Sequence, residues 1–332
     1  MGHDKLRKFA ENETFACLLQ PDASKVLDKT GDPSEGLKLH EHPIKGHWNE
    51  MMFHNDQPIV LELGCGKGEY TIDLSRRVPE RNYIGVDIKG ARLWRGAKTA
   101  TEEGIGNVAF LRTRIEFIEA FFGPGEVREI WLSFSVPQLK SENSRLTSPL
   151  FLERYRKFLR PGGIIHLKTD SRFLHEYSKA VALENGLDIL ASTIDLYGGR
   201  CPSCDVRSAD PTTGFAGGPP SYVAEGGHGL RGTSAAVEKS YQKDSTFAGA
   251  DVERGEYSLG TVRGKYSLGA ELFEVQTFYE RMFLSQGYKI TYLAFTIDHD
   301  GPYKHPETFD SDYWRSIEGP RRFVHSPASS QR

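Results

Sequence analysis

Short apolar runs alternate with stretches of helical periodicity from residue 59 onward. The first run, 59–63, contains Ile59, Val60, Leu61 and Leu63, which is typical of a parallel strand covered on both faces. Similar runs predict strands over 82–86, 108–111, 129–134, 164–167 and 288–296. Helical spacing predicts helices over 69–78, 90–104, 116–122, 148–159, 173–184 and 272–286. This order predicts an α/β fold with a doubly wound, mostly parallel sheet, which the last helix and strand complete.

Breaks in this pattern divide the chain into five parts. Residues 1–56 are polar and irregular, so we expect a loosely packed N-terminal arm. Residues 57–197 form the core of the predicted sheet. Residues 198–270 are rich in Gly, Ser, Pro and charge, which predicts a disordered insertion. Residues 271–298 return to the pattern and complete the core, and 299–332 form a polar tail.

A glycine-rich turn follows the first strand, with glycines at 64, 66 and 68. These glycines let the backbone turn sharply and approach a ligand closely. A dinucleotide fingerprint would need glycine at 69, where the chain has Glu69, and no phosphate-loop motif is present. Glu62 would repel a pyrophosphate and suits a cationic or amine-bearing ligand. A glycine turn without a ligand is the alternative interpretation.

A second acidic position lies about 20 residues beyond the glycines. Asp87 ends the predicted strand over 82–86. A carboxylate at this point is placed to accept both ribose hydroxyls of a nucleoside cofactor. Glu62 and Asp87 together therefore indicate a nucleoside cofactor that carries an amine.

Composition adds few constraints on function. The net charge of −3 and the pI of about 6.4 do not by themselves indicate a nucleic-acid binder, so such a role must rest on local basic patches. No stretch approaches the ~18 apolar residues of a membrane span, and no signal peptide is evident, so we expect a cytoplasmic protein. Cys201 and Cys204 form a C-x-x-C without a second pair, so we expect no metal. We expect a monomer.

Several motifs carry a more specific resemblance. Between Val60 and Asp170, and again at 277–280, the chain resembles the bacterial tRNA (guanine-N7)-methyltransferases, especially their Bacteroidetes-like members. The resemblance covers about half of the chain. It rests on Glu-Leu-Gly-Cys-Gly-Lys-Gly68, Gly-Val-Asp-Ile-Lys-Gly90, the 134–140 segment, Leu-Thr-Ser-Pro149, His-Leu-Lys-Thr-Asp170 and Thr-Phe-Tyr-Glu280. It implies a class I, Rossmann-like fold with an antiparallel C-terminal strand, S-adenosyl-L-methionine as cofactor, and tRNA as substrate. The implied product is N7-methylguanine at the variable-loop guanosine 46.

The resemblance also assigns site residues. Glu62 and Gly64 correspond to cofactor contacts of the first motif, and Asp87 corresponds to the ribose clamp. The loop that lies against the adenine commonly has Asn or Asp in the family, whereas this chain has Arg112 and Arg114. We therefore expect backbone contacts around Thr113 and Arg114. The positions on the substrate side are Lys140, Asp170, Thr277, Tyr279 and Glu280.

One position departs from the family. The usual Pro-Asp-Pro after the fourth strand is Ser135-Val136-Pro137 here. We therefore predict weak or absent turnover, unless Asp170 or Glu280 supplies the missing carboxylate. Two other interpretations stay open: methylation of another RNA or a small molecule, and a degenerate member that binds tRNA without turnover.

Two basic clusters are candidates for RNA contact. Cations at such positions can hold phosphates without reading sequence, and the alternative is a solvated helix face. The clusters are Lys89, Arg92, Arg95 and Lys98, and then Arg154, Arg156, Lys157 and Arg160.

Overall fold

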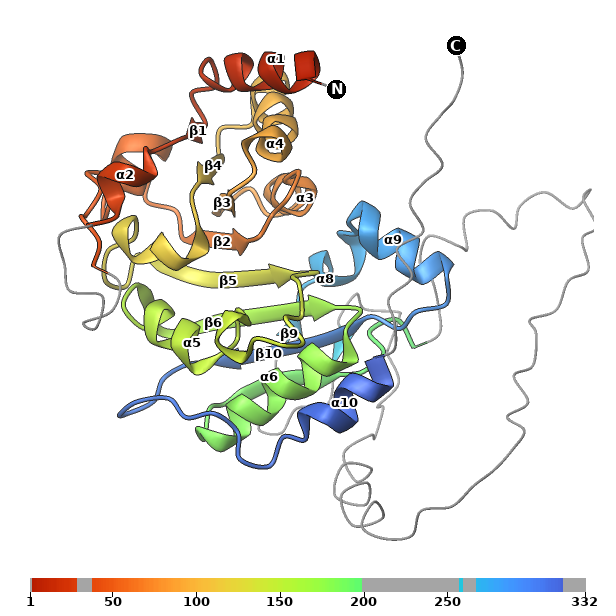
Figure 1. Ribbon diagram of the computed structural model, residues 1–332. Helices are drawn as coiled ribbons and strands as arrows, with labels where there is room; N and C mark the ends of the chain where they lie inside the picture. Colours follow the sequence, from red (N-terminus) through yellow and green to blue (C-terminus); the bar gives the residue numbers. More distant parts are fainter. Residues whose placement is uncertain (1, 29–37, 199–256, 259–266, 319–332) are drawn as a thin grey trace, which may run out of the picture.

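The computed structural model describes residues 2–28, 38–198, 257–258 and 267–318 (Figure 1). Most of the predicted insertion, including Cys201 and Cys204, lies outside the described residues, as does the end of the polar tail.

One eight-stranded sheet organises the chain, in the order β1-β4-β3-β2-β5-β6-β10-β7. All neighbouring strands pair in parallel except β10, which is antiparallel to both β6 and β7. Strands β8 and β9 form a separate two-stranded antiparallel sheet. The strands are β1 Leu18–Leu19, β2 Ile59–Leu63, β3 Asn82–Asp87, β4 Val108–Arg112, β5 Val127–Ser133, β6 Leu159–Thr169, β7 Ile189–Thr193, β8 Tyr257–Ser258, β9 Ser267–Leu268 and β10 Thr291–Thr296. The predicted fold class is confirmed, including the antiparallel C-terminal strand, β10, which lies between β6 and β7.

Helices cover both faces of the sheet (Figure 1). Along β2 every side chain is buried, with Val60 packed in one apolar cluster and Leu61 in the other. Helices α3 and α4 supply the first cluster, and α5 and α6 supply the second. The helical elements are α1 Gly2–Asn12, α2 Ala23–Val26, a π-helix Asn49–Phe53, α3 Glu69–Arg77, α4 Gly90–Glu102, 3₁₀ turns Ile115–Ala120 and Glu142–Ser144, α5 Pro149–Tyr155, α6 Arg172–Glu184, α8 Glu271–Glu274, α9 Phe278–Ser285 and α10 Ser311–Glu318.

The N-terminal segment is better ordered than we expected. Helix α1 packs on α4, and Leu18 and Leu19 of β1 pair with β4. Trp48 is fully buried and donates its indole N–H to the carbonyl of Phe121 at 2.8 Å. The expectation of an irregular, loosely packed arm is therefore wrong for these parts. A few isolated apolar anchors among polar residues produce no periodic pattern, which is why the sequence did not predict them.

Other elements also differ from the expectation. The helix predicted over 272–286 is two helices, because Thr277 caps a new start by accepting the N–H of Glu280 at 3.1 Å. The helix predicted over 116–122 is a 3₁₀ turn. Strand β7 was not predicted, since its alternation with small polar residues is weak. In the predicted polar tail, α10 packs against α6. No helix in the described ranges is long and apolar enough to cross a membrane.

Candidate cofactor and substrate site

The glycine turn after β2 has the geometry of a cradle. Gly64, Gly66 and Gly68 all have positive φ, of 83°, 59° and 73°. A Cβ on Gly64 or Gly66 would meet nothing within 4 Å, so open space lies in front of these two residues. A Cβ on Gly68 would lie 2.5 Å from the Phe110 ring. The first two glycines therefore leave room for a ligand, and the third lets α3 pack closely on β4.

Asp87 closes this cradle from the end of β3. Its side chain is 9% exposed and accepts the N–H of Gly66 at 3.0 Å and the N–H of Lys89 at 2.7 Å. These bonds fix the carboxylate beside the glycine turn. The two acidic positions that the sequence singled out are thus brought to one edge of the sheet, at the carboxyl ends of β2 and β3.

Glu62 lies deeper, as the second-last residue of strand β2. It is buried and accepts a hydrogen bond from the hydroxyl of Thr71. The pKa of Glu62 is raised to about 8, chiefly by burial and to a smaller extent by the nearby Asp87 charge, while the hydrogen bond from Thr71 opposes the shift. The protonated, uncharged form of Glu62 therefore predominates at neutral pH in the free protein. A cationic amine placed nearby would favour its ionised form.

These features fit a nucleoside cofactor with a cationic amino-acid part. The open space over Gly64 and Gly66 admits it, Asp87 can accept the ribose hydroxyls, and Glu62 can supply a counter-charge. The expected adenine contacts come from the loop after β4, whose Arg112 is in register with Asp87.

In that loop Thr113 is buried, whereas Arg114 is half-exposed. The Arg114 guanidinium lies 3.5 Å from the Glu116 carboxylate and over the Phe117 ring, and Arg112 lies over the Phe9 ring. Both arginine side chains thus engage protein groups. Backbone contact near Thr113 stays a prediction.

The loop after β5 lies next to the end of β6. The N–H of Phe134 donates to the carbonyl of Lys168 at 2.8 Å, and the Phe134 ring stacks near Phe283 of α9 at 6.1 Å. Phe134 and Gln138 have positive φ, which marks a strained turn. Val136 sits in this turn and is 68% exposed. Lys140, at the end of the same loop, is also exposed.

Helix α9 begins beside the glycine turn. The N–H of Phe278 donates to the Glu69 carboxylate at 2.9 Å, and the ammonium of Lys67 lies 5.7 Å from the centre of the Phe278 ring. Thr277 is partly exposed and Tyr279 is half-exposed at this start. Figure 1 shows α8 and α9 beside the arrowhead of β5. The cofactor cradle and the expected substrate segments therefore share one edge.

Glu280 does not face the surface. Its side chain is 0% exposed, and one oxygen lies 2.8 Å from the Lys168 ammonium and accepts the Tyr197 hydroxyl at 2.6 Å. In this arrangement Glu280 is the counterion of a buried lysine. Neither Lys168 nor Tyr197 was singled out from the sequence, because no local pattern signals a buried charge.

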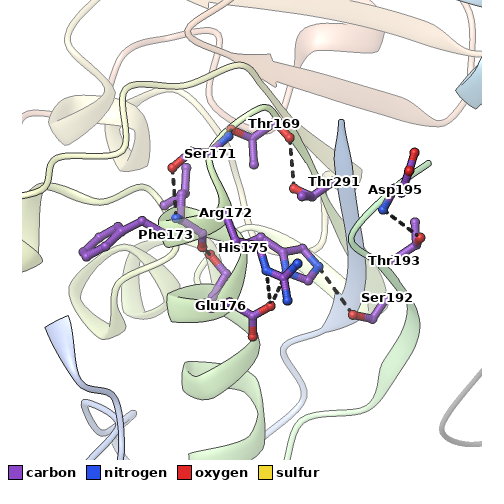
Figure 2. A network of polar contacts seen from close by, with 12 residues as sticks. Thr169, Ser171, Arg172, Phe173, His175, Glu176, Ser192, Thr193, Asp195 and Thr291 are labelled. Carbon is purple, nitrogen blue, oxygen red and sulfur yellow. Dashed lines mark hydrogen bonds and ion pairs between the residues drawn. The ribbon is translucent and has the colours of Figure 1, made fainter. Parts of the chain in front are cut away.

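A polar network fixes the end of β6, where Asp170 follows Thr169 (Figure 2). The Thr291 hydroxyl donates to the carbonyl of Thr169 at 2.9 Å, and the Thr169 hydroxyl accepts the N–H of Ser171 at 3.0 Å. The Ser171 hydroxyl caps α6 by accepting the N–H of Leu174 at 3.1 Å. Asp170 is partly exposed. The hydrogen bonds of Thr169 and Ser171 fix the backbone on both sides of it relative to β10 and α6.

Deeper in Figure 2, His175 lies 3.4 Å from the Ser192 hydroxyl and 3.3 Å from the Glu176 carboxylate. A serine hydroxyl, a histidine and a carboxylate in this order resemble a catalytic triad with a serine nucleophile. However, His175 is fully buried, and Arg172 holds Glu176 at 2.7 Å. This network is therefore best explained as support that joins α6 to β7.

The two basic clusters lie at opposite ends of the parallel strands, the first near their carboxyl ends and the second near their amino ends. Lys89 and Arg92 are exposed at the start of α4, next to Asp87, and Arg95 is exposed one turn further on. The second cluster lies at the amino end of β6, with Arg160 in the strand itself, and there Glu119 pairs with Lys157 at 2.6 Å and with Arg154 at 3.6 Å. Three of its four cations, Arg154, Arg156 and Lys157, thus pair with carboxylates, and the cluster lies away from the cradle.

The sheet order, the antiparallel β10 between β6 and β7, and the glycine turn with its two acidic partners define a class I, S-adenosylmethionine-dependent methyltransferase. Residues 56–196 match the family model described as "Putative methyltransferase". The tRNA (guanine-N(7)-)-methyltransferase of Christiangramia forsetii is 50% identical over 196 residues, which are 58% of this chain and 83% of that relative. The enzyme of the same name from Porphyromonas gingivalis is 57% identical over 159 residues, covering 48% and 65%. This chain belongs to the tRNA (guanine-N(7)-)-methyltransferase family.

A more distant similarity is to the crystal structure of the 16S rRNA methyltransferase KamB. It is 17% identical, with a TM-score of 0.41 over 79% of this chain and 96% of that chain. This similarity is too low to refine the assignment.

Proposed function

We propose that this chain transfers a methyl group from S-adenosylmethionine to N7 of a guanine in tRNA, at the variable-loop guanosine 46, with turnover reduced by Val136. Relatives at 50–57% identity carry the name of this activity. The structural observation that best supports it is the bond between Phe278 of α9 and Glu69 of α3. This hydrogen bond joins the segment that carries the expected substrate residues Thr277 and Tyr279 to the helix that follows the glycine turn.

The chemistry needs little acid–base assistance. Guanine N7 has an in-plane lone pair, so the new N–C bond forms in line as the sulfonium C–S bond breaks, without proton abstraction. The bound cofactor supplies the methyl group as an activated electrophile. The chain's own contribution is to align the two partners and to exclude water. Asp87 orients the ribose, and Asp170, Thr277 and Tyr279 orient the acceptor base.

Val136 weakens the acceptor side in this proposal. A carboxylate here would orient the guanine and stabilise the positive charge that develops on it. Valine can do neither. Asp170 is the better candidate to compensate, because Glu280 is held by Lys168 below the surface.

The exposed cations at the start of α4, Lys89, Arg92 and Arg95, are proposed to hold the tRNA backbone beside the cradle. A cytoplasmic location and a monomeric state stay predictions.

The proposal is tested by incubating the protein with methyl-labelled cofactor and three RNAs. These are unmodified tRNA, the same transcript with adenosine in place of the variable-loop guanosine, and an unrelated structured RNA. We expect label only on the first transcript. Label on all three would favour another RNA substrate. Absence of label despite tRNA binding would favour the degenerate, non-catalytic reading that Val136 suggests.

A further inference from the structure

The Lys168 ammonium is enclosed completely, and each of its three donors has an acceptor. Its side chain is 0% exposed. It donates to the carbonyl of Leu272 at 2.7 Å and to the carbonyl of Val275 at 3.1 Å, and it lies 2.8 Å from a Glu280 oxygen. Leu272 lies in α8 and Val275 is the residue that caps its C-terminal end, whereas Glu280 belongs to α9. Lys168 thus holds both short helices at the point where the helical conformation is interrupted between them.

The backbone of the same residue joins two further segments. Lys168 is in β6 two residues before Asp170, and its carbonyl accepts the N–H of Phe134 from the loop that carries Val136. Lys168 therefore contacts, through its side chain or its backbone, every segment that is proposed to face the acceptor base: the loop after β5, the end of β6, and the start of α9.

A buried ion pair is a costly way to join these segments if stability is the only requirement. Apolar side chains of similar volume often stabilise a core equally well or better. What apolar groups cannot do is fix direction, because only a charged donor with three directed bonds sets the distance between two carbonyls and a carboxylate. Burial lowers the pKa of Lys168, and the Glu280 carboxylate opposes that shift by favouring the ammonium.

We propose that Lys168 is the positioning residue of the acceptor side, which sets α9 against the end of β6, and that Glu280 acts as its counterion and not as a contact to the reacting guanine. This inference rests on the proposed function, because it takes Asp170, Thr277 and Tyr279 as the groups being positioned.

The test uses the full-length protein and the variants Lys168→Met, Glu280→Gln and Arg81→Met. Arg81 forms a partly buried ion pair with Glu129 at 3.0 Å, ahead of β3 at the amino edge of the sheet, so Arg81→Met is the matched control. Each variant is measured for amide hydrogen exchange, cofactor affinity and steady-state tRNA methylation, at temperatures where it is fully folded.

For Lys168→Met we expect faster exchange in 278–285 but not in 69–77, and cofactor affinity within about twofold of the parent. We expect kcat/KM for tRNA to fall about a hundredfold, the usual cost of a misplacement near 1 Å. Glu280→Gln should speed exchange in the same helix, with a smaller kinetic effect, since the amide oxygen can still accept a hydrogen bond. Arg81→Met should change neither the exchange of α9 nor kcat/KM.

Two results would overturn the inference. The first is an unchanged kcat/KM in folded Lys168→Met, which would make the residue merely structural. The second is a loss of kcat in Glu280→Gln without any change in α9 exchange, which would make Glu280 a contact to the reacting base. If Lys168→Met does not fold, Lys168→Met/Glu280→Met removes both charges and takes its place. If the parent protein methylates no tRNA, the proposed function fails, but the exchange data still test whether Lys168 holds α9.

Discussion

The substitution Glu62→Gln tests the electrostatics of the cofactor cradle in the free protein. Glu62 is buried at the end of β2 against Thr71 of α3, and Asp87 of β3 lies near it. Burial raises the pKa of Glu62 from 4.5 to about 8. Because the pKa in the folded state is above that in the unfolded state, the stability contributed by the neutral carboxyl is fully present below pH 4.5. It is lost as the pH rises from 4.5 to about 8.

The magnitude follows from the size of that window. Between pH 4.5 and pH 7 the unfolded chain releases this proton while the folded chain keeps it. Two and a half pKa units at about 1.4 kcal/mol each give about 3.5 kcal/mol, and because the unfolded carboxyl is already half ionised at pH 4.5, the lost stability is roughly 3 kcal/mol. Glutamine does not ionise. The free energy of unfolding of Glu62→Gln should therefore gain roughly 3 kcal/mol relative to the parent over this range.

The assay is urea denaturation of the cofactor-free protein at pH 4.5, 5.5, 6.5 and 7.5, with the parent and variant measured side by side. Titrating groups that do not interact with Glu62 cancel in the difference between the two proteins. The exposed Glu80→Gln on the loop after α3 is the control, and its difference from the parent should not change with pH. A difference for Glu62→Gln that is flat across this range would show that Glu62 is already ionised in the free protein, and would refute the reasoning.

Three further predictions concern the two sides of the site. Val136→Asp should raise the single-turnover rate of tRNA methylation about a hundredfold, because a carboxylate beside the developing cation is restored; a rate equal to that of Val136→Asn would contradict this. Asp87→Ala should weaken cofactor binding tenfold to a hundredfold in calorimetry, through loss of charged hydrogen bonds, while tRNA affinity stays the same; unchanged cofactor affinity would remove Asp87 from the cradle. Replacing Arg92 and Arg95 by Ala should reduce the magnitude of the slope of log tRNA affinity against log salt concentration by about 2. Lys157→Ala is the control and should leave this slope unchanged. Equal slopes for the two variants would show that α4 does not contact the RNA.

Much of the fold could be predicted because its signals are local. The apolar run of β2, the glycines after it and the acidic end of β3 lie within thirty residues of one another. A parallel sheet brings the carboxyl ends of such strands to one edge, so Glu62 and Asp87 could be placed together before the structure was known. The same reasoning applies to Asp170, which follows the predicted strand over 164–167 and lies directly after β6.

What could not be predicted depends on contacts between distant segments. Lys168 and Glu280 are more than a hundred residues apart, and nothing near either of them indicates that both are fully buried. The helix break at Thr277 is hidden because apolar residues keep helical spacing across it. Likewise, the basic cluster around Arg154 could be placed at the end of the sheet away from the cradle only once the course of α5 into β6 was known.

The central claim is most directly tested by locating the transferred methyl group at the level of the atom. Unmodified tRNA is incubated with methyl-labelled cofactor and either the parent protein or Val136→Asp, and the labelled nucleoside is identified by mass spectrometry and by chain cleavage after reduction, which is selective for N7-methylguanine. We predict one labelled guanosine, in the variable loop and methylated at N7, formed slowly by the parent and faster by Val136→Asp. Label on another base or another atom, or no label with either protein, would contradict the assignment.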